Sequence, residues 1–349
     1  MPRIPYRDVE DRLAQVLERL GFDGDDARLC ARLFAETSRD GVYSHGLNRF
    51  PRFVEQIRQG IVDPKARAEP AGGWGAGSAQ SAQSAQSAQS AQSAIERWDG
   101  RGGPGNLNAR TCMERALALS RRHGLGCVAL ANTNHWMRGG SYGWQAVEAG
   151  AIGICWTNTM ANLPAWGAPE PRVGNNPLVI AVPHTDGPVV LDMAMSQFSF
   201  GALESYRLRG EALPVDGGFD REGNLTRDPA AIEASGRALP IGSWKGSGLA
   251  MMLDMLAALL SGGLATHQIQ VDVIRESRLS QVFLAFDLAA IDAAGNREAL
   301  IRGILDSVRG PRTAERLRTP GERIARTRIE NLEHGIPVDD RVWQIISEM

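Results

Sequence analysis

A histidine and an arginine four residues apart are the side chains of this sequence best suited to acid–base chemistry. His45 lies between Ser44 and Gly46 in the stretch SRDGVYSHGLNRFPRF, so little bulk surrounds its ring. The ordinary pKa of histidine suits proton transfer near neutrality. If Ser44 caps a helical turn, His45 and Arg49 share one face of that turn. A proton donor and a cation that binds carboxylates could then act on one ligand.

A second group of polar residues, NTNHWMRGGSY, directly follows the apolar run 126–131, which predicts a buried strand. Ligands of α/β layers bind beyond the carboxyl ends of strands. Asn134 and His135 could line a ligand there, although ordinary turn chemistry also explains the loop. Asn176, in the turn GNNP, is open to the same two interpretations. We expect no metal site, because no third ligand is spaced with His45 and His135.

Two further segments could bind a ribose or an anion. Asp192 lies in the apolar run 189–195, a predicted strand, and could accept hydrogen bonds from a ribose or cap the next turn. Lys245, in SWKGSG, lies at the start of a predicted helix, where backbone amides attract anions. It could contact a phosphate, act as a Schiff-base nucleophile or be an ordinary solvated lysine. The sequence has no GxGxxG motif after a strand, so these residues alone do not identify a cofactor.

Helical periodicity predicts that both ends of the chain are helical. The predicted helices there are 8–20, 25–37, 51–59, 297–308, 321–333 and 338–346. Pro51 should begin the third of them and bias Phe50 toward extended geometry. We expect the C-terminal helices to pack back on the N-terminal region.

The middle of the chain alternates short apolar runs with helical segments, which is typical of α/β layers. The predicted strands are 126–131, 152–157, 178–183, 189–195 and 280–288, and the predicted helices are 108–123, 142–148 and 246–260. Residues 78–94 repeat Ser-Ala-Gln without any large apolar side chain, which predicts a solvated insert. The predicted regions are a helical N-terminal region at 1–69, the insert at 70–94, an α/β cofactor-binding domain at 95–296 and C-terminal helices at 297–349.

The composition indicates a globular protein with a small ligand. The chain has 349 residues, 43% of them hydrophobic, which is enough to bury a substantial core. Its 38 Lys and Arg against 40 Asp and Glu give a net charge of −2 without any block of like charge, so we expect neither a nucleic acid nor a membrane as partner. Four cysteines without a CxxC pair predict reduced core thiols. The N-terminus lacks an apolar stretch, so we expect a cytoplasmic protein without a signal peptide.

Several segments together resemble the malate/L-lactate dehydrogenase family, whose nicotinamide-binding fold is not a Rossmann fold. The segments are SRDGVYSHGLNRFPRF, NTNHWMRGGSYGWQA, IGICWTN, LPVDGGFDREGNLT and GSWKGSG. The resemblance runs almost end to end, except around 70–94 and 312–318. It implies a mixed-sheet α/β domain, a helical domain formed from both chain ends, a homodimer, and NAD(H) in preference to NADP(H).

The resemblance also implies a reaction, the reduction of the C2 ketone of a 2,3-diketo acid. Malate, lactate or a cyclic imine acid are alternative substrates within the family. A lyase that uses Lys245 as a Schiff base and a non-catalytic binding protein are the alternatives outside it.

Carried over to this sequence, the resemblance gives each candidate residue a role. His45 would donate the proton, Arg49 would bind the substrate carboxylate, and His135 would join them in the catalytic group. Asn134 and Asn176 would line the substrate pocket beside them. The implied cofactor contacts are Val190, Leu191, Asp192, Met193, Ala194, Trp244, Lys245, Gly321, Glu322 and Arg323.

Overall fold

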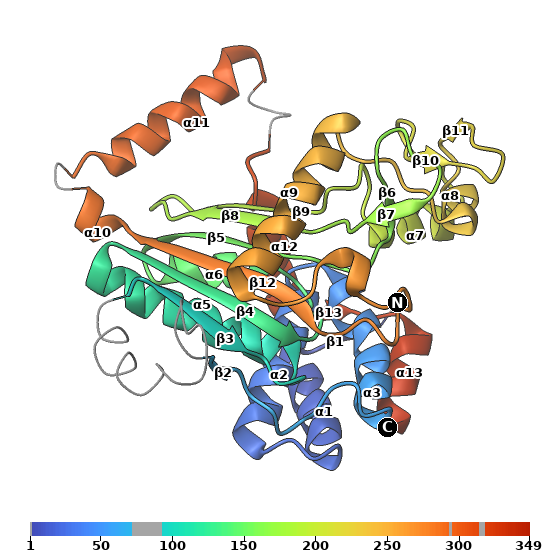
Figure 1. The fold of residues 1–349 in the computed structure, drawn as a ribbon, viewed down its shortest axis with the longest axis horizontal. Coiled ribbons are helices and arrows are strands. Elements are labelled where there is room, and N and C mark those ends of the chain that lie inside the picture. Colours follow the sequence, from blue (N-terminus) through green and yellow to red (C-terminus); the bar gives the residue numbers. More distant parts are fainter. Residues whose placement is uncertain (1, 72–92, 293–294, 314–317) are drawn as a thin grey trace, which may run out of the picture.

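A mixed sheet of seven strands forms the centre of the computed structural model, which describes residues 2–71, 93–292, 295–313 and 318–349 (Figure 1). The order across the sheet is β2-β3-β4-β12-β5-β8-β9. These strands are β2 (Glu69–Pro70), β3 (Ile95–Asp99), β4 (Leu125–Thr133), β5 (Ala151–Thr157), β8 (Leu178–Val182), β9 (Val189–Met193) and β12 (Leu279–Asp287). Only β3 and β4 pair in parallel, and the other neighbours are antiparallel. The predicted α/β class with a mixed sheet is confirmed.

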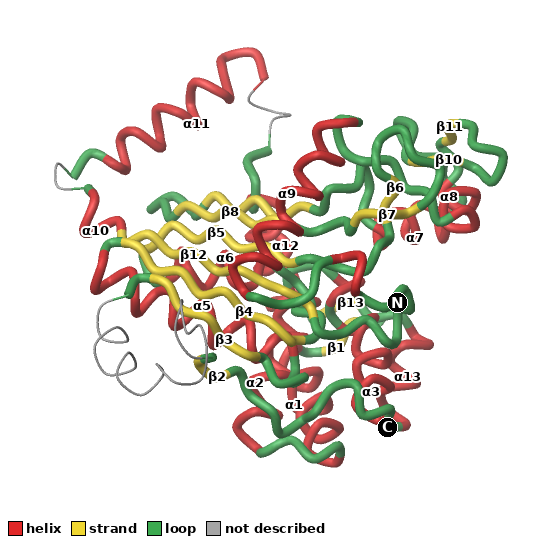
Figure 2. Tube along the Cα trace, in the orientation of Figure 1, coloured by secondary structure: helices red, strands yellow, loops and turns green. Residues whose placement is uncertain are grey.

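Helices cover both faces of this sheet (Figure 2). The helices α5 (Gly105–His123) and α6 (Gly140–Glu148) lie on one face, and α9 (Trp244–Ser261) lies on the other. Successive residues of β4 point to opposite faces of the sheet. Val128 packs in the core with α5, and Ala129 packs in the core with α9. Burial on both sides explains why β4 reads as a continuous apolar run rather than an alternating one.

The two ends of the chain share one hydrophobic core, which we call the helical arm. It contains α1 (Tyr6–Arg19), α2 (Gly24–Arg39), α3 (Phe50–Arg58) and α13 (Asp340–Glu348). The strand β1 (Arg3–Ile4) pairs with β13 (Ile336–Pro337), and α12 (Glu322–His334) contacts α2. The helix α11 (Arg297–Thr313) lies across the sheet from the helical arm in Figure 1. The predicted packing of the C-terminal helices on the N-terminal region therefore does not include α11.

Short elements between β9 and α9 form a small unit for which the sequence analysis predicted no element. They are α7 (Phe200–Arg209), β10 (Gly218–Phe219), β11 (Leu225–Thr226) and α8 (Pro229–Ser235). The remaining short elements are β6 (Leu163–Pro164), β7 (Pro171–Val173) and α10 (Leu288–Ile291). A Cβ on Gly201, in the first turn of α7, would lie 2.6 Å from the Ser44 side chain. This unit therefore reaches the segment that carries His45.

The four cysteines, Cys30, Cys112, Cys127 and Cys155, are all buried and unpaired, which confirms the prediction of reduced core thiols. Burial raises the pKa of Cys30 to about 12. Within the described ranges, no helix combines the length and the apolar character needed to cross a bilayer. The Ser-Ala-Gln insert falls almost wholly outside the described residues.

Candidate active site

His45 lies in an irregular segment between α2 and α3, not in one continuous helical turn. Two short 3-10 helices, η1 (Tyr43–His45) and η2 (Leu47–Arg49), are separated by Gly46, whose φ of −101° and ψ of −123° interrupt the helical path. Ser44 caps neither of them, so the condition under which His45 and Arg49 were expected to share one face is not met. The Ser44 hydroxyl instead lies 2.9 Å from Nδ1 of the neighbouring His45 ring. Ser44 therefore orients the imidazole.

The same segment is fixed against the helices on either side of it. The Ser38 hydroxyl, at the end of α2, accepts a hydrogen bond of 2.8 Å from the Leu47 N–H, and a Cβ on Gly46 would collide with that hydroxyl. Phe50 is helical, with φ −58° and ψ −44°, although it precedes Pro51. The prediction of extended geometry is wrong there because the Phe50 ring is fully buried in the core of the helical arm, and that packing outweighs the local preference.

His135 follows β4 and stacks on His45. Their ring centroids are 6.0 Å apart and their planes are inclined by 27°. The Met137 N–H donates to His135 Nδ1 over 3.0 Å, which places the proton of the neutral ring on Nε2. Burial, followed by the charge of Arg49, lowers the pKa of His45 to about 4 and that of His135 well below its ordinary value. Both rings are therefore neutral at pH 7 in the protein without ligand.

Arg49 carries a buried positive charge that its surroundings compensate only in part. Its side chain is 13% exposed, and Nη2 lies 3.9 Å from Oε2 of Glu276. Its Nε is buried without a hydrogen-bond partner among the described residues. Burial, and next the charge of Arg52, lower the pKa of Arg49 to about 10. A guanidinium with unused donors beside two histidines is suited to a planar carboxylate.

The two asparagines predicted to bind substrate are bonded within the protein. Asn176 is fully buried, since its Oδ1 accepts from the Thr159 N–H over 3.0 Å and its Nδ2 donates to the Ala250 carbonyl over 2.8 Å. Both polar groups of Asn176 are therefore used within the protein, as the turn interpretation expects, and its substrate contact stays a prediction. Asn134 is also buried and donates to the Gly102 carbonyl over 2.7 Å. Its Oδ1 has no partner among the residues that the structure describes.

The first and last predicted cofactor segments meet at β9, the edge strand of the sheet. The Val190 N–H donates to the Pro320 carbonyl over 3.1 Å. Gly321 has a φ of +92°, and a Cβ there would lie 3.2 Å from the Val190 nitrogen, so a side chain would crowd the strand. A pocket of about 240 Å³ opens beside this contact, and Val189, Gly321 and Glu322 contribute to its lining.

The other predicted cofactor residues differ in exposure and bonding. Lys245 and Arg323 are exposed, and so is Trp244 at the start of α9. Glu322 accepts a hydrogen bond of 3.0 Å from the Thr319 N–H at the start of α12. A Schiff-base lysine must be desolvated to act as a nucleophile, and the exposure of Lys245 does not provide this condition.

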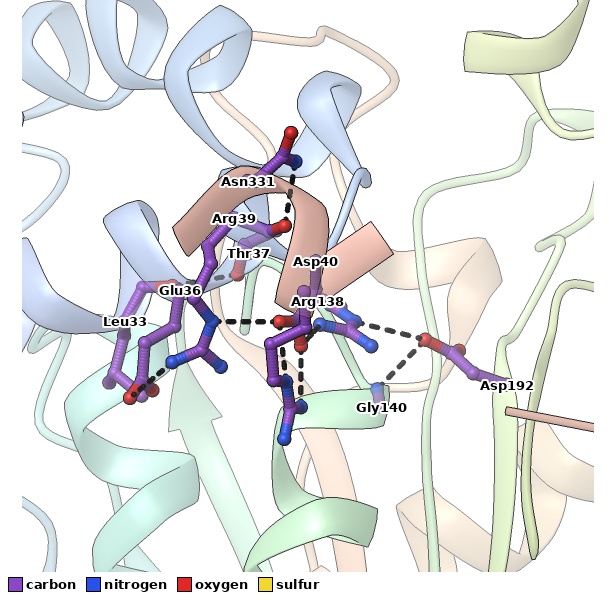
Figure 3. Close-up of polar contacts among 10 residues, drawn as sticks. Leu33, Glu36, Thr37, Arg39, Asp40, Arg138, Gly140, Asp192 and Asn331 are labelled. Carbon is purple, nitrogen blue, oxygen red and sulfur yellow. Dashed lines mark hydrogen bonds and ion pairs between the residues drawn. The ribbon is translucent and has the colours of Figure 1, made fainter. Parts of the chain in front are cut away.

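A buried ion cluster that the sequence analysis did not identify joins the helical arm to the sheet (Figure 3). Asp40, just after α2, lies 2.9 Å from Arg39 Nε, 2.7 Å from Arg138 Nη1 and 2.7 Å from Arg328 Nη2. Burial opposes ionisation, but the hydrogen bonds from Arg328 and the charges of Arg138 and Arg39 hold the pKa of Asp40 below its ordinary value. Arg138 also lies 3.9 Å from Asp192 on β9.

Local patterns could not reveal this cluster, because its members come from segments far apart in the chain. Asp40 and Arg138 both lie in polar stretches that the sequence analysis singled out, and Arg328 lies in a predicted helix. The sequence offered one signal for the cluster: each of these stretches contains a charged residue to which no partner was assigned. Glu276, beside Arg49, was missed for the same reason.

Comparison with known proteins gives consistent results along the whole chain. The family model for malate/L-lactate dehydrogenase matches residues 4–347. The chain is 44% identical to the 2,3-diketo-L-gulonate reductase of Citrobacter koseri over 354 residues, which cover 99% of this chain and 100% of the relative. A reductase of the same name from Klebsiella pneumoniae is also 44% identical, over 353 residues with the same coverage.

Solved structures agree with this result. A dehydrogenase from Sinorhizobium meliloti has a TM-score of 0.83 at 27% identity, over 99% of this chain and 97% of that chain. The Δ1-piperideine-2-carboxylate reductase of Pseudomonas syringae pvar. tomato has a TM-score of 0.83 at 25% identity, over 100% and 99%. The predicted class, an oxidoreductase of hydroxy or keto acids that uses a nicotinamide cofactor, is confirmed. The chain belongs to the malate/L-lactate dehydrogenase family.

Proposed function

We propose that this protein reduces 2,3-diketo-L-gulonate to 3-dehydro-L-gulonate at the expense of NADH. The observation that carries the proposal is the partly compensated Arg49 guanidinium beside the stacked rings of His45 and His135. A 2-keto acid has a carboxylate next to a ketone, which matches a cation next to two proton-bearing rings. The relatives named 2,3-diketo-L-gulonate reductase, 44% identical over the full length, support this particular keto acid.

Arg49 binds the substrate carboxylate in this proposal, and that contact changes the protonation of its neighbour. In the protein without ligand, Arg49 is the first charge that lowers the pKa of His45 after burial. A bound carboxylate offsets this charge, so the pKa of His45 rises when the substrate arrives. His45 can then take up a proton and pass it to the alkoxide that forms at C2. General acid catalysis of this kind contributes about 10²- to 10⁴-fold.

His135 supplies a second polar contact to the ketone. Its Nδ1 is occupied by the Met137 N–H, so Nε2–H is the donor left for a ligand. A neutral imidazole that donates a hydrogen bond polarises a carbonyl without giving up its proton. The Ser44 hydroxyl lies 2.9 Å from Nδ1 of His45, which leaves Nε2 of His45 for the transferred proton.

The edge of the sheet at β9 fits the cofactor. The bound reduced nicotinamide supplies the hydride that reduces the C2 ketone. The Asp192 side chain is 29% exposed, and because the Gly140 N–H donates to its Oδ2 over 2.9 Å, Oδ1 is left to accept from a ribose hydroxyl. The pocket beside Gly321 is lined in part by Asp306 and Glu322. Arg302 and Arg309 line the same pocket, so its charges do not exclude the additional phosphate of NADP(H), and NAD(H) is proposed from the resemblance to the family.

We further propose a cytoplasmic homodimer, as the resemblance to the family implies. The outer side of α9 exposes Met251, Met255 and Leu259, and Leu259 is 71% exposed. Apolar side chains gathered on one helix face are typical of a surface that another protein covers. A second copy of the chain is the partner proposed for this face.

The direct test follows the loss of NADH or NADPH absorbance with a panel of acids. The panel contains 2,3-diketo-L-gulonate, oxaloacetate, pyruvate and a cyclic imine acid. We expect the highest kcat/KM with 2,3-diketo-L-gulonate and NADH. A higher kcat/KM with another acid would assign that acid as the substrate, still within the family. If neither cofactor is oxidised with any acid, the protein is not a reductase of these acids. Borohydride with substrate should leave Lys245 unlabelled, whereas labelling would support the lyase.

A further inference from the structure

We propose that Asp40 is a positioning residue for the cofactor, because it holds Arg138 away from Asp192. This inference rests on the proposed function in one respect, that Asp192 contacts the cofactor. It assigns a role to the Asp40 carboxylate. Arg138 lies between this carboxylate and Asp192, which belongs to the proposed cofactor segment (Figure 3).

Asp40 is the centre of a cluster that is poor in negative charge. Its side chain is 2% exposed, and Arg39, Arg138 and Arg328 all lie within 2.9 Å of its two oxygens. The other acidic neighbours are Glu36, 3.6 Å from Arg39, and Asp192, 3.9 Å from Arg138, while the charge of Glu148 acts on Arg328. Three buried or partly buried cations therefore depend mainly on one carboxylate.

Arg138 lies between two carboxylates and is bonded to only one of them. Its Nη1 donates to Asp40 over 2.7 Å, with a side chain that is 4% exposed. Its Nε is buried without a hydrogen-bond partner among the described residues, and it stops 3.9 Å from Asp192 Oδ2. A buried N–H without a partner is unfavourable, so Arg138 would close this gap if Asp40 did not hold it.

Asp192 is held from the opposite direction. The Gly140 N–H donates to the same Oδ2, and a Cβ on Gly140 would lie 2.6 Å from that oxygen, so the backbone approaches it closely. The Asp192 carboxylate is thus bonded to one backbone donor and kept out of a direct bond with Arg138. A direct bond would draw the carboxylate toward the ion cluster and away from the ribose hydroxyls that it is proposed to accept from.

The position of Asp40 in the chain gives this contact a wider effect. Asp40 directly follows α2 and closely precedes the segment of His45. Arg328 belongs to α12, which begins beside Gly321 and β9. The Asp40 carboxylate therefore fixes the position of Arg138 relative to the segment that carries His45, to β9 and to the start of α12.

The test compares cofactor binding by a single and a double variant of the full-length protein. We expect Asp40→Asn to weaken NADH binding about tenfold, the effect of losing one charge-assisted hydrogen bond, measured by NADH fluorescence. The KM for NADH should rise by a similar factor, while kcat at saturating NADH stays within about twofold. The double variant Asp40→Asn, Arg138→Gln should bind NADH more tightly than Asp40→Asn alone, since the arginine that captures Asp192 is gone.

Two controls separate this proposal from a merely structural role and from failure of the cofactor contact. Arg39→Gln removes another partner of Asp40 and should lower the Tm without changing the dissociation constant of NADH. Asp192→Asn should weaken NADH binding. If Asp192→Asn has no effect, the proposed cofactor contact is wrong. If it weakens binding but Asp40→Asn does not, or if the double variant binds no better than Asp40→Asn, the role of Asp40 is wrong.

A second variant covers the case in which Asp40→Asn does not fold. Asp40→Glu keeps the charge and its partners but reaches one methylene further toward Arg138, which lies between the two carboxylates (Figure 3). The proposal expects weaker NADH binding in this folded variant, because Arg138 is moved toward Asp192. A wild-type dissociation constant in Asp40→Glu would show that only the charge matters and would overturn the proposal.

Discussion

The imidazole rings of His45 and His135 lie nearly parallel with their centroids 6.0 Å apart, although one belongs to the helical arm and the other follows β4. Each ring uses Nδ1 within its own segment, His45 with the Ser44 hydroxyl and His135 with the Met137 N–H. Both Nε2 atoms are therefore left for a ligand. The proposed reaction needs this pair at the boundary between the arm and the sheet.

Replacement of His45 by alanine should remove the proton donor. We expect kcat for 2,3-diketo-L-gulonate to fall by about two orders of magnitude or more, while the dissociation constant of NADH changes little. Steady-state kinetics and NADH fluorescence measure the two quantities. His267→Ala, at an exposed position in the 3-10 helix Thr266–Gln268, is the matched control and should retain activity. Turnover close to normal in His45→Ala would exclude His45 as the donor.

Replacement of Arg49 by lysine keeps the charge but loses the planar pair of donors. We expect the KM for keto acids to rise about tenfold or more, because a bidentate carboxylate contact becomes a single one. Initial rates over a range of substrate concentrations give the KM. Arg58→Lys, at an exposed position near the end of α3, should leave it unchanged. If the KM of Arg49→Lys matches that of the wild type, another residue binds the carboxylate.

The pH dependence of reduction follows from the pKa of His45, which burial and then Arg49 lower to about 4. Reduction needs the protonated ring, and above this pKa its fraction in the free enzyme falls tenfold for each pH unit. We therefore expect kcat/KM for reduction to fall steadily between about pH 5 and pH 8. The kcat profile should break at higher pH, because the bound carboxylate offsets Arg49. A kcat/KM independent of pH over this range would contradict the assignment.

A charge on the outer side of α9 should prevent the proposed dimer. Leu259 is 71% exposed in the single chain, so Leu259→Arg should leave the monomer fold intact while it places an unpaired charge in the interface. Light scattering after gel filtration should report a dimer for the wild type and a monomer for this variant. Leu208→Arg, at a position that is 70% exposed on α7, is the matched control. A dimer that persists in Leu259→Arg would place the interface elsewhere.

Periodicity located the long elements because each one buries a regular face. The apolar residues of α1 recur at helical spacing, and residues 126–131 of β4, which face a core on both sides, read as one apolar run. The strand β3 was missed because the charged residues of its sequence, IERWD, interrupt the apolar pattern. One of them, Glu96, accepts a hydrogen bond from Arg115 on α5. In the unit between β9 and α9, the strands and α8 are short, and α7 was missed because it buries only Leu203 and so shows little apolar periodicity.

The candidate site was only partly visible in the sequence. His45 and Arg49 could be singled out because their types and spacing are local features, and the resemblance then gave them roles. The ion pairs of Asp40 with Arg138 and Arg328 depend on tertiary contacts between distant segments, and no local pattern contains such information. The burial of Asn176 was likewise hidden, because the turn GNNP looks the same whether its side chains face a ligand or the protein interior.

The pairing of β1 with β13 has a consequence for the order of events during synthesis. Residues 3 and 4 meet residues 336 and 337, and Asp40 meets Arg328, so the arm that carries His45 is completed by the last tenth of the chain. Domains begin to fold while the ribosome is still adding residues. We therefore expect the segment that carries His45 to reach its final position only after α12 and β13 have left the ribosome.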